Sequence, residues 1–167
     1  MNTHAHQGEL AEEAIHVEVE IEERAEVLVL PPTGETALVE VIRARLALDA
    51  DVYLFERDHD EPLVHVDYKR RHVRVVGHRC HEVTLEVRYE HETKHHRFRP
   101  SGTVFRGLQW AVSKHGFKLD PMQAAKANLI LPGADMPLPR DDVLGKFVKP
   151  GHCTLVVDLT LKDFTNG

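Results

Sequence analysis

One order of elements occurs twice in this chain, and it restricts the fold more than any other feature. The first copy has strict apolar and polar alternation over residues 16–22, a return strand over 25–30, and a helix over 35–48. The second copy begins roughly 65 residues later, with alternation over 83–89, a return strand ending at Arg99, and a helix over 103–115. A repeated order of this kind predicts two small domains in preference to one large one.

Short apolar segments follow each helix. After the first helix we expect strands over 52–55, 62–68 and 72–76, and after the second helix we expect strands over 129–131 and 154–161. Pro132 and Gly133 predict a tight turn, and Gly116 predicts the end of the second helix. The apolar faces of the two helices consist of Leu38, Val41, Ile42 and Leu46 in the first, and Val104, Leu108, Ala111 and Val112 in the second.

The most compact arrangement of these elements is a mixed sheet around one helix. A lone hairpin buries too little surface to be stable, so the hairpin, the helix and the last strand of each copy must share one core. The last strand then lies beside the first, which is the β-grasp arrangement. We therefore predict an α+β chain with a flexible leader (1–14), two tandem β-grasp domains (15–80 and 82–162) and a tail (163–167).

The composition limits the cellular setting and the partners. With 167 residues and 42% hydrophobic content, the chain can bury one medium core or two small ones. It has no apolar run long enough to span a bilayer and no signal peptide, so we expect a cytoplasmic protein. A net charge of -6 argues against bulk nucleic-acid binding. Glutamates crowd the start, and we interpret them as a solvated face that could complement the basic residues Lys69, Arg70, Arg71, Arg74 and Arg79.

Reactive and metal-binding side chains give weaker signals. The two cysteines, Cys80 and Cys153, are far apart, so we expect no disulfide scaffold and interpret Cys153 as a semi-buried thiol, not a nucleophile. No metal site is predicted, because zinc-like spacing is missing among the clustered histidines His78, His81, His91, His95 and His96. Phe105 and Trp110 lie off the apolar stripe of their helix, and core or interdomain packing is favoured over a partner contact.

The second half resembles ubiquitin in four pieces that occur in the correct order. Residues 100–116 (PSGTVFRGLQWAVSKHG) resemble the entry and body of its helix, and residues 129–133 (LILPG) resemble its third strand and turn. Residues 136–148 resemble the short strand and one-turn helix, and residues 154–161 resemble the last strand. Two such domains in tandem, ending on glycine, resemble bacterial ubiquitin-like modifiers of the BilA type, whose antiphage operons also encode activating, conjugating and metalloprotease-like enzymes.

This resemblance implies a protein modifier, not an enzyme. An activating enzyme would use ATP and Mg²⁺ to adenylate the carboxylate of Gly167, a cysteine would take it as a thioester, and a lysine amine would form the isopeptide bond. The chain itself would then need no cofactor. Its implied partners are an activating enzyme, a conjugating enzyme, a deconjugating metalloprotease and a target lysine, with neither nucleic acid nor membrane among them.

The resemblance also implies which residues take part. Gly167 would be the conjugated residue, and it follows a tail of Asp163, Phe164, Thr165 and Asn166. The familiar end of ubiquitin-like modifiers differs, because it has two glycines after arginines. We expect this tail to be extended and to pack against nothing. The implied partner-binding residues are Leu129, Ile130, Leu159 and Leu161. Because the companion of Ile130 on the last strand is Asp158, we expect standard ubiquitin readers to bind poorly.

Two other functions remain open at this point. The chain could be a noncovalent adaptor with the same fold and an inert tail. It could also be a sulfur carrier with a C-terminal thiocarboxylate, which is less favoured because those chains usually have a single domain and end in two glycines. A thioester formed with an activating enzyme and ATP would separate the modifier from the adaptor.

Overall fold

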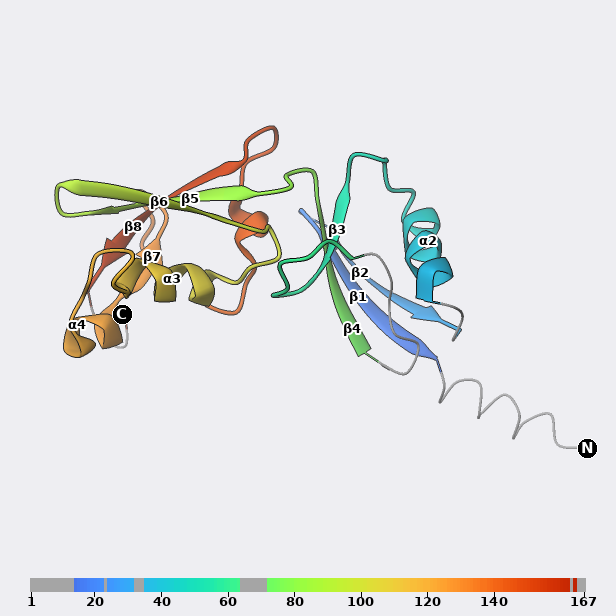
Figure 1. Ribbon diagram of the computed structural model, residues 1–167, viewed down its shortest axis with the longest axis horizontal. Coiled ribbons are helices and arrows are strands. Elements are labelled where there is room, and N and C mark those ends of the chain that lie inside the picture. The colour runs from blue at the N-terminus through green and yellow to red at the C-terminus, as the bar shows by residue number, and fades with distance from the viewer. Residues whose placement is uncertain (1–13, 23, 32–34, 64–71, 163, 165–167) are drawn as a thin grey trace, which may run out of the picture. The chain divides into compact units, whose positions relative to one another are not determined.

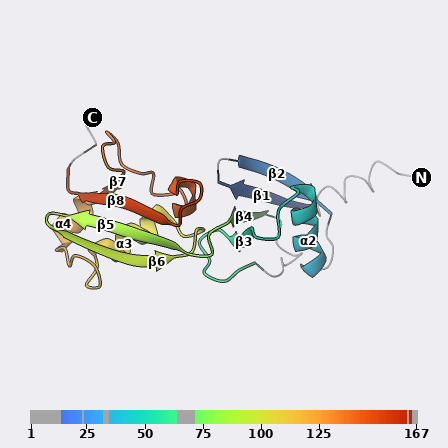
Figure 2. The same ribbon diagram turned by 90° about the horizontal axis from the view of Figure 1, so that it is seen from above.

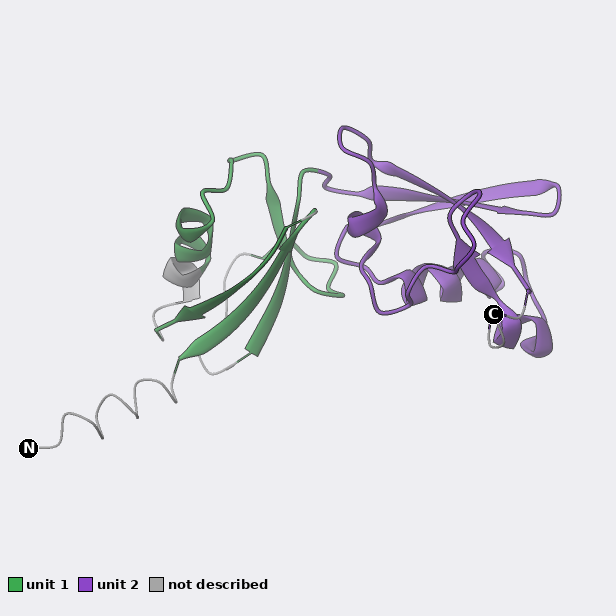
Figure 3. Ribbon diagram, turned by 180° about the vertical axis from the view of Figure 1, so that it is seen from behind, with its two compact units in different colours: residues 1–79 green, residues 80–167 purple. Residues whose placement is uncertain are grey.

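The computed structural model describes residues 14–22, 24–31, 35–63, 72–162 and 164, and it divides into two compact units, residues 1–79 and 80–167 (Figure 3). Unit 1 contains β1 (Ile15–Ile21), β2 (Arg24–Leu30), α2 (Glu35–Arg45), β3 (Tyr53–Glu56) and β4 (His72–His78) (Figure 1). Unit 2 contains β5 (Val83–Tyr89), β6 (Glu92–Phe98), α3 (Val104–Val112), α4 (Pro121–Lys126), β7 (Asn128–Ile130), the 3-10 helix η1 (Leu144–Phe147) and β8 (Thr154–Thr160).

Both units contain a four-stranded mixed sheet with the same topology. The strand orders are β2-β1-β4-β3 and β6-β5-β8-β7. In each sheet the first two strands form an antiparallel hairpin, and the last strand lies parallel to the first. Figure 2 shows β5 and β8 side by side in unit 2. The predicted fold class, two tandem β-grasp domains, is confirmed.

The alternation in unit 1 separates a buried face from a charged one. The odd-numbered apolar residues of β1 pack against α2, in a core that includes Ile15, Val17, Val19, Val39, Ile42 and Leu46. On the other face Arg74 of β4 lies 3.2 Å from Glu18 and 3.8 Å from Glu20. The complementary charges expected from the sequence therefore meet within the chain at Arg74, while residues 69–71 lie outside the described residues.

Two details of unit 1 differ from the expected elements or cannot be compared with them. Of the predicted strand over 62–68, Pro62 forms an isolated bridge with Phe55, and residues 64–68 lie outside the described residues. The side chain of Leu38, expected on the apolar face of α2, also lies outside them. The predicted apolar face of the helix is confirmed at Ile42 and Leu46, which are fully or almost fully buried.

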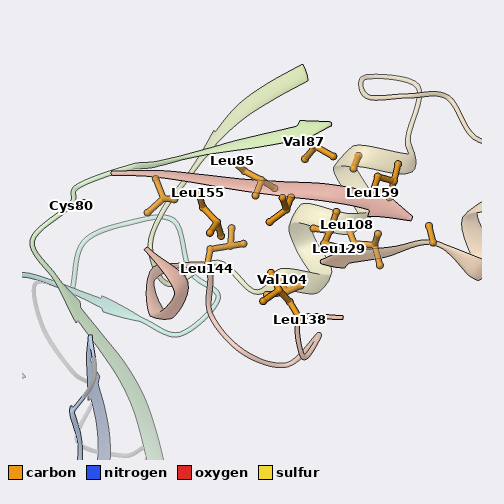
Figure 4. Close-up of a cluster of buried hydrophobic side chains, with 14 residues drawn as sticks. Cys80, Leu85, Val87, Val104, Leu108, Leu129, Leu138, Leu144, Leu155 and Leu159 are labelled. Atoms are coloured by element: carbon orange, nitrogen blue, oxygen red, sulfur yellow. The ribbon is translucent and has the colours of Figure 1, made fainter. Parts of the chain in front are cut away.

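Unit 2 has one continuous core between its sheet and α3 (Figure 4). The inward-facing side chains of β5 and β8 pack against the helix face predicted from its spacing, and the fully or nearly fully buried members include Val83, Leu85, Val87, Val104, Leu108, Ala111, Leu155, Val157 and Leu159. Thr103 caps the helix, because its hydroxyl accepts a hydrogen bond from the Arg106 amide at 3.2 Å.

Gly116 does not end α3, so that prediction is wrong. The helix ends at Val112 with Ser113 as its C-cap, whose backbone amide donates to the Trp110 carbonyl at 3.1 Å. Gly116 is needed for a different reason: a Cβ at this position would lie 2.3 Å from the carbonyl oxygen of Ala111. Its own carbonyl accepts a hydrogen bond from Lys94 Nζ at 2.7 Å.

The short helix α4 was not predicted, although its sequence carries a start signal. Asp120 accepts a hydrogen bond from the Gln123 amide at 2.8 Å, and the Gln123 side chain accepts one from the Asp120 amide at 3.3 Å. This reciprocal pair is a capping box, followed by proline at the first helical turn. The one-turn helix expected within residues 136–148 is confirmed as η1.

Cys80 and Cys153 form a disulfide, so the prediction of a semi-buried thiol is wrong. Their Cα atoms lie 5.7 Å apart although 73 positions separate them in the sequence. The parallel pairing of β5 with β8 explains this meeting, because each cysteine precedes one of the two strands. The carbonyl of Cys153 also accepts a hydrogen bond from the Thr84 amide at 2.9 Å. Of the helices in the described ranges, none is long and apolar enough to cross a membrane.

Candidate functional site

The outward face of the unit 2 sheet is the first place where the implied partner-binding residues can be compared with the structure. Ile130 of β7 lies directly opposite Asp158 of β8, and Asp158 lies in register with Arg88 of β5. This row crosses three neighbouring strands. It confirms that the companion of Ile130 is an acidic residue, as the resemblance to ubiquitin implied.

Asp158 is engaged by Arg88 and is not a free carboxylate. Arg88 donates hydrogen bonds from Nε to Oδ1 at 2.8 Å and from Nη2 to Oδ2 at 3.2 Å. The hydrogen bond to Asp158 and the charge of its carboxylate raise the pKa of the Arg88 guanidinium. Both side chains are substantially exposed, so a bidentate ion pair occupies the middle of this face. The middle of this face therefore carries charge, beside the partly exposed side chain of Ile130.

Leu129 and Leu159, two of the four implied partner-binding residues, are core residues. Their exposed fractions are 1% and 5%, and both belong to the cluster between the sheet and α3. Strand alternation explains this correction, because neighbours in sequence point to opposite faces of the sheet. Their side chains are therefore not available to a partner, and only Ile130 and Leu161 of the four are partly exposed.

The base of the tail packs against unit 2 at Phe164. This side chain is half-buried and lines a groove of about 540 Å³ together with Pro137, Arg140 and Leu161. The expectation that the tail packs against nothing is wrong for Phe164, because its side chain is partly buried where it lines this groove. Asp163, Thr165, Asn166 and Gly167 lie outside the described residues.

Trp110 and Phe105 have different environments. Trp110 is half-buried against the unit 2 core and stacks on His96, with ring centroids 5.3 Å apart. It also meets Phe98 edge-on at 6.3 Å, so the preferred interpretation of Trp110 as a packing residue is confirmed. Phe105 is 45% exposed and does not belong to the core cluster.

The described histidines do not converge on a common centre. His96 stacks on Trp110, and His95 faces Glu86 in the strand register. In the described ranges there is no group of three or more His, Cys, Asp or Glu residues that could hold a metal ion.

These features define the class of protein. Two mixed sheets of common topology, with a helix on the second sheet, a one-turn helix before the last strand and a tail after it, make this a ubiquitin-like protein. Residues 84–162 match the family described as BilA ubiquitin-like domain 2. This stretch of unit 2 is therefore a BilA-like ubiquitin-like domain. A search of curated proteins finds no significant match.

Proposed function

We propose that this chain is a ubiquitin-like protein modifier whose Gly167 carboxylate is activated and joined to a target amine. The observation that carries the proposal is the match of residues 84–162 to a BilA ubiquitin-like domain, because that range ends where β8 passes into the tail. Glycine suits the proposed end, since without a Cβ its carboxylate can enter a channel too narrow for other residues. A bacterial antiphage conjugation system in the cytoplasm is part of the same proposal.

In the proposed chemistry this chain supplies only the carboxylate that reacts. The Gly167 carboxylate attacks the α-phosphate of Mg²⁺-bound ATP and displaces pyrophosphate, and a cysteine thiol of the activating enzyme then displaces AMP. After transfer to a conjugating enzyme, a lysine amine of the target displaces the thiol to form the isopeptide bond. A deconjugating metalloprotease would hydrolyse that bond. The catalytic groups all belong to the partners, and this chain contributes an unhindered acyl group and a folded surface.

Incubation with the activating enzyme of its own system, ATP and Mg²⁺ tests the proposal. We expect a thioester between the two proteins that appears on a non-reducing gel and disappears when reducing agent is added. The internal disulfide does not confuse this result, because its reduction leaves the mass of the chain almost unchanged. Absence of the thioester under conditions in which the enzyme consumes ATP with another modifier would favour the noncovalent adaptor.

A further inference from the structure

The groove at the base of the tail combines positive charge with apolar surface. The residues that matter in its lining are Lys126, Pro137, Arg140, Leu161, Lys162 and Phe164, which come from α4, from the segment after β7 and from the chain just beyond β8. Phe164 occupies one side of it, with Lys162 Nζ 5.6 Å from the centre of its ring. Any protein that handles the tail must approach this part of unit 2.

The three cations of this groove keep their charge available. Arg140 Nη2 donates to the carbonyl of Ala127 at 3.0 Å and to Oδ1 of Asn128 at 3.3 Å, and both acceptors are neutral. The guanidinium is thus held in position without being neutralised. Within the described part of the chain, no carboxylate pairs with Lys126, Arg140 or Lys162. By contrast, ion pairs engage Arg24, Arg74, Arg88, Arg97, Arg99 and Lys146.

Exposed methionines add apolar area beside these cations. Met122 is 76% exposed and precedes Lys126 by one helical turn of α4, so the two side chains lie on the same side of that helix. Met136 is 62% exposed and directly precedes Pro137 of the groove. Methionine adapts its shape to a partner, and methionine, arginine and aromatic residues are enriched at protein interfaces.

We propose that these residues form a docking surface, the tail-exit surface, for an acidic and partly apolar face of the enzyme that activates the C-terminus. Its members are Met122, Lys126, Met136, Arg140, Lys162 and Phe164. Carboxylates of the enzyme would pair with the three cations, and its apolar side chains would cover the methionines and Phe164. The positive charge is local on a chain of net charge -6, so it orients the approach of an acidic partner to this end. The identity of the partner rests on the proposed function.

The test uses the whole chain and the activating enzyme of its own system. The variant carries Lys126→Glu and Lys162→Glu, because both side chains are exposed and make no hydrogen bond that supports the fold in the described structure. We expect the KM of thioester formation to rise at least about tenfold with kcat unchanged, since two attractive charges become repulsive. The charge-matched control carries Lys114→Glu and Lys149→Glu, two exposed lysines outside the groove, and should keep the original KM.

Further measurements separate this inference from the proposed function. Met122→Ala with Met136→Ala tests the apolar part and should also raise KM. Binding of the enzyme without ATP, followed by fluorescence anisotropy, tests docking even if no thioester forms. A normal thioester with unchanged KM and affinity in the Lys126→Glu, Lys162→Glu variant overturns the docking surface and leaves the modifier intact. Failure of the original chain to bind the enzyme also overturns the docking surface. So does a result in which the Lys126→Glu, Lys162→Glu variant loses affinity for single-stranded DNA but keeps its affinity for the enzyme.

Discussion

Cys80 and Cys153 are joined by a disulfide at the start of the two central strands of unit 2. The bond closes a loop with a sequence separation of 73, and Cys80 is itself part of the buried core. The disulfide therefore links the N-terminal ends of β5 and β8, and these two strands supply much of the inward face of the sheet. The cross-link restricts the unfolded chain, and this restriction should stabilise unit 2.

We predict that Cys153→Ser lowers the free energy of unfolding of unit 2 by roughly 2–4 kcal/mol, because the long closed loop of the unfolded state is released. Urea denaturation followed by fluorescence measures this change, since Trp110 is the only tryptophan and packs against the unit 2 core. The same loss is expected when the original chain is reduced. A chain with both cysteines replaced by serine should not respond to reductant, and equal stability of the oxidised and reduced original chain would contradict the prediction.

Gly116 offers a test of backbone packing after α3. Gly116→Ala places a Cβ against the carbonyl oxygens of Ala111 and Trp110, at 2.3 and 2.5 Å, so the loop must move and its bond to Lys94 is disturbed. We expect a loss of about 1–3 kcal/mol in the free energy of unfolding of unit 2. Gly133→Asn is the matched control, because no atom lies within 4 Å of its Cβ position and asparagine tolerates its positive φ. Similar losses in the two variants would disprove the packing argument.

The row of Arg88, Asp158 and Ile130 predicts weak binding of ubiquitin readers. A reader that buries an apolar face of ubiquitin would have to desolvate the Arg88 and Asp158 pair here, so we expect affinity at least about tenfold lower than for ubiquitin. Replacing both charges, with Arg88→Thr and Asp158→Val, should recover part of that affinity. Fluorescence anisotropy with a labelled reader domain measures both effects, and equal affinity of the reader for the original chain and for ubiquitin would be the opposing result.

Gly167→Ala separates conjugation from folding. If Gly167 enters a narrow channel of the activating enzyme, an added Cβ should reduce the rate of thioester formation by about tenfold or more. The melting temperature should stay unchanged, because the side chain would be added at the chain end. Asn166→Ala, one residue earlier in the tail, serves as the control and should retain most of the rate. A lowered melting temperature in Gly167→Ala would show that the end contributes to the fold.

The surface residues show how far a sequence can predict a site. The pairing of Ile130 with Asp158 followed from the resemblance to ubiquitin, because strand register keeps such positions opposite each other. The assignment of Leu129 and Leu159 to a partner surface failed, since apolar type alone does not tell which face of a strand a residue occupies. Arg140 and Lys126 were not predicted at all, because they come from separate segments and meet only when α4 and the chain after β7 fold beside the tail.

The sequence alone determined the local structure and its repetition. Alternation over residues 16–22 and 83–89 and the helical spacing of apolar residues are short-range signals, and they predicted the strands, the main helices and the two β-grasp domains. Only the tertiary structure decided that Cys80 meets Cys153, that Arg88 meets Asp158, and that Phe164 and Pro137 line one groove. These contacts depend on the parallel pairing of β8 with β5 and on where the chain leaves it, which no local pattern encodes.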